Sequence, residues 1–266
     1  MGTIRVESTS MFRATAFEYR FRFILHSVIF LLGFTAPWNY ALHTDPSGPN
    51  AHLWGVLAAD VARLGVGNFT TSFNILLGIG IACAVIGATL RTWGAAYLGA
   101  NIVQSQTMHT AQVAPVAGIL QDGPFRFVRN PLYLGTFMHT LALSLLMPRS
   151  GAIFAIAGIG LLQIRLILAE EQFLSARLGA PYAAYCAAVP RIIPLVRSKA
   201  VPTGLKPRWT QAFLGEIYMW GVAGSFAIAG WRYNAGLLLQ CVLVSLGVSL
   251  LVRALVTRPG PEPAAA

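Results

Sequence analysis

Long apolar runs separated by short polar segments dominate the residue pattern of this chain. About six runs are long enough, or nearly long enough, to cross the roughly 30 Å hydrocarbon core of a bilayer as helices. They cover residues 21–42, 73–93, 132–147, 151–169, 211–231 and 235–255. The pattern therefore predicts an all-α fold, a polytopic integral membrane bundle of about six transmembrane helices.

The third run is the shortest, and Pro148-Arg149-Ser150-Gly151 follows it directly. Such a connection favours a tight turn, which predicts a helical hairpin formed by the third and fourth runs. In the second run, small residues recur every four positions and predict a close-packing helix face: Gly80, Ala84 and Ala88. Residues 51–64 carry apolar side chains on one helical face and predict an amphipathic helix at the outer membrane surface.

The composition agrees with a membrane protein. Of 266 residues, 56% are hydrophobic and only 11% are charged, whereas a soluble domain has about 25% charged residues. These proportions exclude the soluble, disordered, collagen-like and disulfide-scaffold classes. Cys83, Cys186 and Cys241 lie far apart, and none belongs to a Cys-x-x-Cys pair. The sequence therefore predicts neither a metal site nor a disulfide framework.

Positive charge is concentrated in a few polar segments. Lys and Arg number 19 against 9 Asp and Glu, which gives a net charge of +10. Four arginines precede or open the first run: Arg5, Arg13, Arg20 and Arg22. Eight further cations lie in residues 94–131 and 170–210. The positive-inside rule places these segments and both termini in the cytoplasm, and we expect a bacterial inner membrane. In such a protein the charge predicts contact with anionic lipid and gives no support to nucleic-acid binding.

The chain divides into four segments. Residues 1–93 form an N-terminal transmembrane region, and residues 94–210 hold the hairpin and most polar motifs. Residues 211–258 form a C-terminal helix pair, and the Pro/Ala-rich residues 259–266 are expected to be disordered. The start of the chain, through Arg13, is too polar for a secretory signal, so the first run is expected to remain as an anchor. Paired halves with interrupted helices, typical of transporters, are not present. The oligomeric state is left open.

One group of motifs lies just before the hairpin. Gly123-Pro124-Phe125 favours a turn, and Pro131 stands where it can open the third helix at its first turn. Asn130 is then a candidate N-cap, and the free backbone N–H groups of that first turn suit an anion such as a carboxylate. A plain loop-to-helix junction anchored by Arg126 and Arg129 is the alternative.

A second group follows the hairpin. Glu170 and Glu171 stand at the predicted end of the fourth helix, where the helix dipole disfavours carboxylates and a cationic partner is expected. Arg165 lies in the apolar run just before them. An ionisable residue at that depth indicates a functional site, unless its side chain extends to the membrane surface. We expect Arg129, Arg165 and the two glutamates to converge at one end of the hairpin.

The two groups follow a fixed order: Gly-Pro-aromatic at 123–125, Arg-Asn-Pro-x-Tyr-x-Gly at 129–135, Glu-Glu at 170–171, Leu-Gly-x-x-Tyr-x-x-Tyr at 178–185 and Val-Pro at 189–190. This set, within about residues 90–194, resembles the catalytic half of the isoprenylcysteine carboxyl methyltransferases and the related phospholipid N-methyltransferases. Two positions depart from the family pattern. Asn130 replaces a histidine, which keeps a hydrogen-bonding side chain but loses a titratable one, and Leu178 replaces a phenylalanine.

The resemblance implies an S-adenosylmethionine-dependent methyltransferase that acts on a lipophilic acceptor entering from the bilayer, with residues 94–210 as its catalytic region. It implies catalytic roles for Arg129, Arg165 and Glu170. The cofactor-binding residues it implies are Phe125, Arg129, Asn130, Pro131, Tyr133, Gly135, Glu170, Glu171, Tyr182 and Tyr185. The glutamates would accept hydrogen bonds from ribose hydroxyls or the cofactor's amino group. Tyr182 and Tyr185 would cover the site, or alternatively pack at the membrane surface.

Methyl transfer needs alignment and desolvation more than it needs acid or base groups. Arg165 or Arg191 is a candidate for holding a substrate carboxylate. A carboxylate nucleophile requires no general base, whereas an amine or thiol does, and His109 is then the nearby histidine candidate. Three other interpretations stay open: phospholipid N-methylation, an NADPH-dependent enzyme resembling membrane sterol reductases, and a non-catalytic membrane protein.

Overall fold

The computed structural model describes residues 12–36, 52–98, 119–198 and 200–256. All regular elements in these residues are helical. The α-helices are α1 (Ala16–Arg20), α2 (Arg22–Thr35), α3 (Leu53–Arg63), α4 (Phe69–Leu98), α6 (Pro131–Ser144), α7 (Arg149–Leu178), α8 (Ala180–Ala188), α9 (Trp209–Gly215), α10 (Ile217–Ala229) and α11 (Ala235–Val256). The 3-10 helices are η2 (Gly123–Arg126) and η3 (Gly230–Arg232). The predicted all-α class is confirmed.

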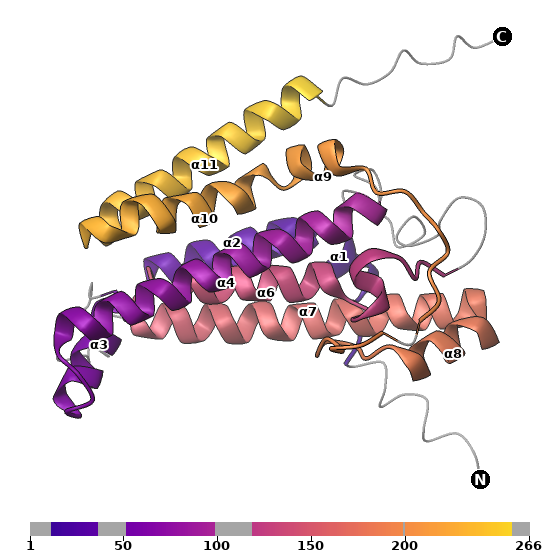
Figure 1. Cartoon of the computed structure of the whole chain (residues 1–266), viewed down its shortest axis with the longest axis horizontal. Helices are drawn as coiled ribbons and strands as arrows, with labels where there is room; N and C mark the ends of the chain where they lie inside the picture. Colours follow the sequence, from indigo (N-terminus) through magenta and orange to yellow (C-terminus); the bar gives the residue numbers. More distant parts are fainter. Residues whose placement is uncertain (1–11, 37–51, 99–118, 199, 257–266) are drawn as a thin grey trace.

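The helices form an elongated bundle (Figure 1). α4 packs on α6, α6 packs on α7, and α2 lies against α7. α10 covers the other side of α4, and α11 packs on α10. α3 lies at one end of the bundle, while η2 and α8 lie at the opposite end. The hairpin of α6 and α7 therefore runs the length of the bundle, and the start of α6 lies at the end away from α3.

Glycines allow α4 and α6 to approach closely. A Cβ atom at Gly87 would lie 2.7 Å from the Gly135 carbonyl oxygen, and a Cβ atom at Gly135 would lie 2.8 Å from the Gly87 carbonyl oxygen. Side chains at these positions would force the two helices apart. The predicted close-packing face of Gly80, Ala84 and Ala88 is confirmed, since all three residues are buried.

Fewer than six of the described helices have the length and hydropathy expected of a membrane span. In the described part of the chain, three helical stretches are long and apolar enough to cross a membrane: α4, α7 and Ala235–Val252 of α11. α9 and α10 make a fourth when taken together, although they are bent by 66° at their junction. α2 and α6 have 14 residues each, and a helix of that length covers only about 21 Å. Residues 37–42 of the first predicted run lie outside the described residues.

The predicted amphipathic helix at residues 51–64 is present as α3, and its apolar face packs against α4. Trp54 is 1% exposed and stacks on Phe73, with 4.0 Å between ring centroids. Its indole Nε1–H donates to the Phe73 carbonyl oxygen at 2.9 Å. The Leu53 N–H donates to the Met147 carbonyl oxygen at 2.7 Å. α3 is thereby fixed both to α4 and to the turn of the α6–α7 hairpin.

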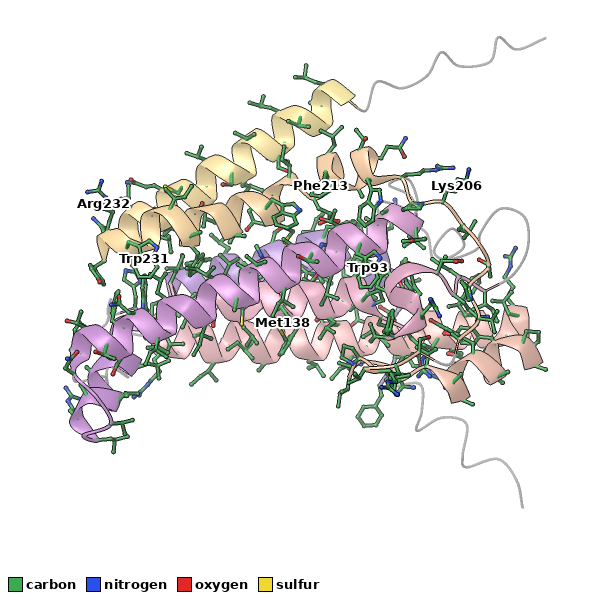
Figure 2. All side chains as sticks on the ribbon, viewed as in Figure 1. Trp93, Met138, Lys206, Phe213, Trp231 and Arg232 are labelled. Carbon is green, nitrogen blue, oxygen red and sulfur yellow. The ribbon has the colours of Figure 1, made fainter. Side chains whose placement is uncertain are left out.

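Aromatic and cationic side chains mark the two ends of the bundle. Trp231 and Arg232 lie at the end near α3, whereas Trp93 and Lys206 lie toward the opposite end (Figure 2). Between the ends, α11 exposes large apolar side chains that suit contact with lipid: Leu243, Val244, Leu250 and Leu251. Tryptophan at both ends and apolar surface between them is the distribution expected of a membrane protein.

Candidate active site

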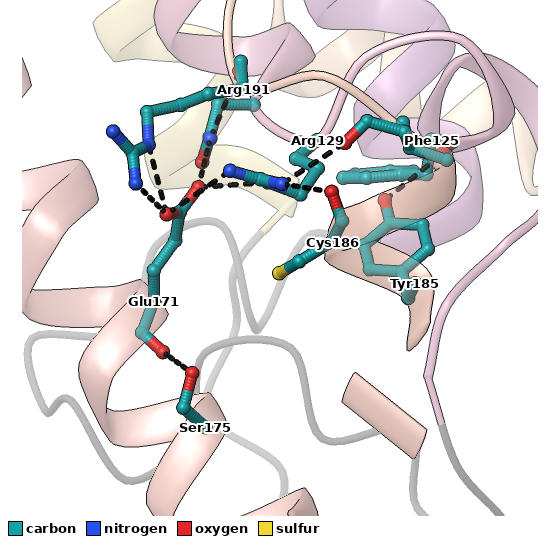
Figure 3. Close-up of polar contacts among 9 residues, drawn as sticks. Phe125, Arg129, Glu171, Ser175, Tyr185, Cys186 and Arg191 are labelled. Carbon is teal, nitrogen blue, oxygen red and sulfur yellow. Dashed lines mark hydrogen bonds and ion pairs between the residues drawn. The ribbon is translucent and has the colours of Figure 1, made fainter. Parts of the chain in front are cut away.

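Glu171 is the centre of a charged network at the end of the bundle away from α3. Arg129 donates from Nε and Nη2 to the two Glu171 carboxylate oxygens at 3.0 and 3.3 Å. Asn130 donates from Nδ2 to Oε1 at 3.2 Å. Arg191 donates from Nε to Oε2 at 2.9 Å, and its Nη2 lies 2.8 Å from the same oxygen (Figure 3). Two guanidinium groups face one carboxylate, so the network has a net charge of +1.

Arg129 also fixes the chain that follows α8. Its Nη1 donates to the carbonyl oxygens of Cys186 and Val189 at 2.8 and 3.0 Å. Its backbone N–H donates to the Pro190 carbonyl oxygen at 2.9 Å. The start of α6, the end of α8 and the C-terminal third of α7 are therefore held together by one arginine.

The start of α6 follows the prediction in its backbone but not in its side-chain bonding. Pro131 is the first residue of the helix, and Asn130 occupies the N-cap position. The Asn130 side chain makes no capping hydrogen bond; its Nδ2 donates to Glu171 and, at 3.1 Å, to the Arg191 carbonyl oxygen. Gly135, a predicted cofactor contact, lies where α6 crosses α4.

α7 is longer than predicted. The apolar run ends at Ala169, but the helix continues to Leu178 and includes both Glu170 and Glu171. The expectation that these carboxylates stand at a helix C-terminus is therefore wrong. Glu171 has cationic partners because it is buried, with 8% of its surface exposed, and a buried charge requires pairing.

Glu170 has different partners from its neighbour. The Tyr133 hydroxyl donates to Glu170 Oε1 at 2.9 Å, and the Tyr19 hydroxyl of α1 also hydrogen-bonds to this carboxylate. Tyr133 and Tyr19 pack in one apolar cluster with Ala169. Successive residues of an α-helix point about 100° apart, so the two glutamates reach different sides of α7.

Tyr182 and Tyr185 are packed into a core beside the network. They are 3% and 6% exposed, and they belong to one cluster with Leu174 and Val189. The Tyr185 hydroxyl donates to the Phe125 carbonyl oxygen at 2.8 Å (Figure 3). Burial raises the pKa of both tyrosine hydroxyls above the ordinary value. The contacts of Tyr185 correspond to the packing alternative.

Arg165 binds a residue of α1. Its Nε and Nη2 donate to the Glu18 carboxylate oxygens at 2.9 and 2.8 Å. The Arg165 guanidinium, together with hydrogen bonds from Thr15, lowers the pKa of Glu18 to about 2. The four residues expected to converge are therefore divided among three contacts: Arg129 with Glu171, Tyr133 with Glu170, and Arg165 with Glu18.

A second buried ion pair was not predicted from the sequence. Arg91 of α4 donates from Nε and Nη2 to the two Glu216 carboxylate oxygens at 2.7 and 2.8 Å, and from Nη1 to the Thr136 hydroxyl at 2.8 Å. Glu216 lies at the bend between α9 and α10, and its side chain is 4% exposed. The criterion that singled out Arg165, an ionisable residue within an apolar run, applies equally to Arg91. Tyr19 carries no such signal, because it lies outside every motif.

The described histidines make their contacts elsewhere. They are His26, which contacts the Arg22 carbonyl oxygen, His52, which contacts the Leu146 carbonyl oxygen, and His139, whose ring meets Tyr218 edge-on. His139 is 2% exposed, as expected of a helix-packing residue. His109, the candidate base for an amine or thiol acceptor, lies outside the described residues.

Comparison with protein families bears on this site directly. Residues 75–180 match the family model of the phospholipid methyltransferases. The chain carries a phospholipid methyltransferase domain. The family predicted from the motifs is thereby confirmed, and the match supports a membrane methyltransferase that acts on lipid. Searches of curated proteins and of solved structures gave no match. The phospholipid methyltransferase domain contains Arg129, Tyr133 and both glutamates, whereas Tyr19 and Arg191 lie outside it.

Proposed function

We propose that the protein transfers a methyl group from S-adenosylmethionine to a carboxylate of a lipophilic acceptor, as isoprenylcysteine carboxyl methyltransferases do. One observation carries the proposal: within the phospholipid methyltransferase domain, the buried Glu170 carboxylate is held by the Tyr133 hydroxyl beside a charged network of net charge +1. Tyrosine hydroxyls orient this carboxylate, and no arginine is among the hydrogen bonds described for it. Such a carboxylate suits a ligand that donates hydrogen bonds.

The residues at this end of the bundle fit the cofactor chemically. S-adenosylmethionine presents hydroxyl and ammonium donors, a carboxylate and a positively charged sulfur. Glu170 supplies a carboxylate for the donors, and Tyr133 supplies an aromatic ring beside it. Arg191 is the most accessible member of the charged network, with 47% of its side chain exposed. Its guanidinium suits a carboxylate of the cofactor or of the acceptor.

When bound, the cofactor supplies an electrophilic methyl group that an ionised carboxylate attacks without a general base. The residues of the chain then act by position and by exclusion of water, and near-attack geometry can contribute about 7–11 kcal/mol to lowering the barrier. Glu170 binds donor groups of the cofactor. Arg191 holds the acceptor carboxylate, a role that we assign to it because Arg165 binds Glu18. Arg129 and Asn130 position Glu171, which in turn fixes Arg191.

We further propose that this end of the bundle faces the cytoplasm. Cations that flank the network support this orientation: Arg126, Arg177, Arg197 and Arg208. At the opposite end, Asp60 pairs with both Arg63 and Arg149 and cancels one of their two charges. The positive-inside rule favours the cytoplasm for the end with the larger excess of cations.

Phospholipid N-methylation is the second candidate, and the description of the matched family favours it. The acceptor would then be an amine, which must lose a proton before it can attack. The two candidates differ in the bond that they form, since a methyl ester is cleaved by mild base and an N-methyl group is not. This difference decides the choice of assay.

The first test is cofactor binding by the full chain purified in detergent. Calorimetry with S-adenosylhomocysteine is expected to show binding by the wild type and by Asp60→Asn, a change at the opposite end, and loss of binding by Glu170→Gln. Equal binding by all three proteins would remove Glu170 from the site. A thermal shift with NADPH and none with S-adenosylmethionine would replace the proposal with the reductase interpretation.

The second test identifies the product. The protein is incubated with membrane lipid extract and S-adenosylmethionine that carries a radioactive methyl group, and the labelled lipid is treated with mild base. Release of the label as methanol is expected for a carboxyl ester. Label that survives the treatment would exclude the ester and favour N-methylation.

A further inference from the structure

The segment that contains α1 is fixed to α7 next to Glu170. The Ala14 N–H donates to the Arg165 carbonyl oxygen at 3.0 Å. The Glu18 carboxylate binds the Arg165 guanidinium through both of its oxygens. These contacts hold α1 within about one and a half helical turns of Glu170 along α7.

Tyr19 reaches from α1 into the core around this carboxylate. It is 1% exposed and packs with Leu166, Ala169 and Tyr133, which are residues that surround Glu170 on α7 and α6. A tyrosine buried this deeply requires a partner for its hydroxyl, because an unsatisfied buried hydroxyl is costly. The Glu170 carboxylate, which accepts from Tyr133 of the same cluster, also interacts with the Tyr19 hydroxyl.

Arg22 brings a positive charge to the same place. It is 7% exposed, and its guanidinium lies 4.4 Å from the centroid of the Tyr19 ring. Its Nη1 also donates to the Tyr19 carbonyl oxygen at 3.0 Å. The charge of this guanidinium acts on Glu170. A cation held against the ring of Tyr19 attracts the nearby carboxylate and helps to fix its position.

We infer that Tyr19 and Arg22 are positioning residues for Glu170, so that the cofactor site is completed by a segment outside the phospholipid methyltransferase domain. The inference rests on the proposed role of Glu170 in binding S-adenosylmethionine. Tyr133 and Tyr19 contact the carboxylate from two helices, and Arg22 places a positive charge close to it. The segment before the domain thereby sets the affinity for the cofactor and leaves the acceptor contact at Arg191 unchanged.

The test uses changes that keep the packing. Tyr19→Phe retains the ring and removes only the hydroxyl. Its matched control is Tyr233→Phe, which removes a hydroxyl that donates to Asn74 at 2.9 Å elsewhere in the bundle. Tyr19→Phe is expected to raise the KM for S-adenosylmethionine and the Kd for S-adenosylhomocysteine about five- to tenfold. The kcat, the KM for the acceptor and the Tm are expected to stay near those of the wild type, and Tyr233→Phe is expected to change none of these values.

Arg22 is tested by charge. Arg22→Gln is expected to weaken cofactor binding about as much as Tyr19→Phe does, and Arg22→Lys is expected to restore most of the affinity because it keeps the positive charge. If Arg22 had only a structural role, both Arg22 variants would bind the cofactor equally weakly. Their Tm would fall, and their KM values for the cofactor and the acceptor would both rise. That result would overturn the inference.

The outcomes separate the inference from the function on which it rests. If Glu170→Gln abolishes binding of S-adenosylhomocysteine while Tyr19→Phe and Arg22→Gln bind it as tightly as the wild type, the inference fails and the proposed function stands. If Glu170→Gln itself binds normally, the proposed role of Glu170 fails, and the inference fails with it. Weakened binding in Glu170→Gln, Tyr19→Phe and Arg22→Gln, with normal binding in Tyr233→Phe, supports both.

Discussion

Glu171 accepts hydrogen bonds from two arginines and an asparagine, whereas Glu170, the residue before it, is held by tyrosine hydroxyls. Both side chains belong to the same helix, and both residues are 8% exposed. They differ in charge balance, because the partners of Glu171 carry two positive charges in direct contact and the hydroxyl partners of Glu170 carry none.

The difference separates structural from ligand-binding carboxylates. A carboxylate bound by guanidinium groups is already neutralised, and withdrawing it would leave buried cations without a partner. Hydroxyl groups orient a carboxylate without neutralising it, so it can still attract a positively charged ligand. Two identical residues that stand side by side can therefore have opposite uses, and only their neighbours distinguish them.

The largest expected effect is loss of stability in Glu171→Gln. The amide would leave Arg129 and Arg191 without a counter-charge, and breaking a buried ion pair typically costs about 3–5 kcal/mol. We expect about 3 kcal/mol, the lower value, because Arg191 is half-exposed. Thermal unfolding in detergent measures the loss, with Glu170→Gln as the matched variant. Equal destabilisation by the two variants would contradict the division of roles.

Tyr133→Phe tests the other half of the comparison. The change removes a hydroxyl that donates to Glu170 at 2.9 Å and leaves the ring in place. We expect about a tenfold loss of affinity for S-adenosylhomocysteine, equivalent to ~1.4 kcal/mol, with a loss of unfolding free energy of about 1.5 kcal/mol, the lower value for a hydrogen bond to a carboxylate. Calorimetry and thermal unfolding on the same preparation give both values. Unchanged affinity would show that the Tyr133 hydroxyl does not contribute to cofactor binding.

A smaller effect is expected at the pair of Glu18 and Arg165, and it depends on pH. The folded protein holds the Glu18 pKa at about 2, below the ordinary value of 4.5. On acidification the unfolded chain binds the proton first, so the stability from this pair is present above about pH 4.5 and is lost as the pH falls toward 2. The difference in Tm between the wild type and Glu18→Gln is expected to be clear at pH 6 and to shrink along that range.

The control for this pH experiment is Arg165→Lys, which keeps the charge of the pair but loses its fork of two hydrogen bonds. Its difference from the wild type should shrink over the same range of pH as that of Glu18→Gln. A difference that stays constant from pH 6 to pH 3 would show that the Glu18 carboxylate does not stabilise the folded protein through its charge.

The smallest effect is expected for Asp60→Asn. Asp60 binds Arg63 and Arg149 on the surface, where the arginine side chains are 68% and 47% exposed. Exposed ion pairs typically contribute about 0–1 kcal/mol. We expect a change in unfolding free energy below about 0.5 kcal/mol and no change in cofactor binding. A larger loss of unfolding free energy would mean that the ion pairs of Asp60 stabilise the fold more than their exposure indicates.

Much of the fold follows from local pattern. Two predicted features depend on a few neighbouring residues and are present in the structure: proline at the start of α6 and the close-packing face of α4. The tight turn of the hairpin is also present, but it lies at residues 145–148, because α7 already begins at Arg149, within the turn predicted at residues 148–151. The length of α7 does not follow from hydropathy, because charge ends an apolar run without ending a helix. The residues after Ala169 are good helix formers, and the helix ends only at Gly179, whose φ is +59°. A search for helix stop signals would have placed that end correctly.

The candidate site was only partly predictable for a different reason. Arg129 and Glu171 lie at the facing ends of a hairpin, so a short turn brings them together. Arg165 and Glu18 are separated by 147 residues, and their contact depends on where α1 packs. Periodicity within one helix gives no information about the packing of another. For that reason Arg165 was expected beside Glu170 and Glu171, whereas it binds Glu18.

The ion pair of Arg91 and Glu216 has a consequence for how the protein is assembled in the membrane. The two residues are 125 positions apart, so α4 is synthesised long before Glu216 exists. Until then the charge of Arg91 has no carboxylate partner at Glu216. Arg91 lies toward the C-terminal end of α4, so inserting it costs less than the roughly 2.5–3.5 kcal/mol of a charge at the helix centre. The apolar remainder of α4 outweighs that cost at insertion. We expect Glu216 to neutralise this charge once it is synthesised, so that the ion pair favours packing of α10 on α4 after α4 has been inserted.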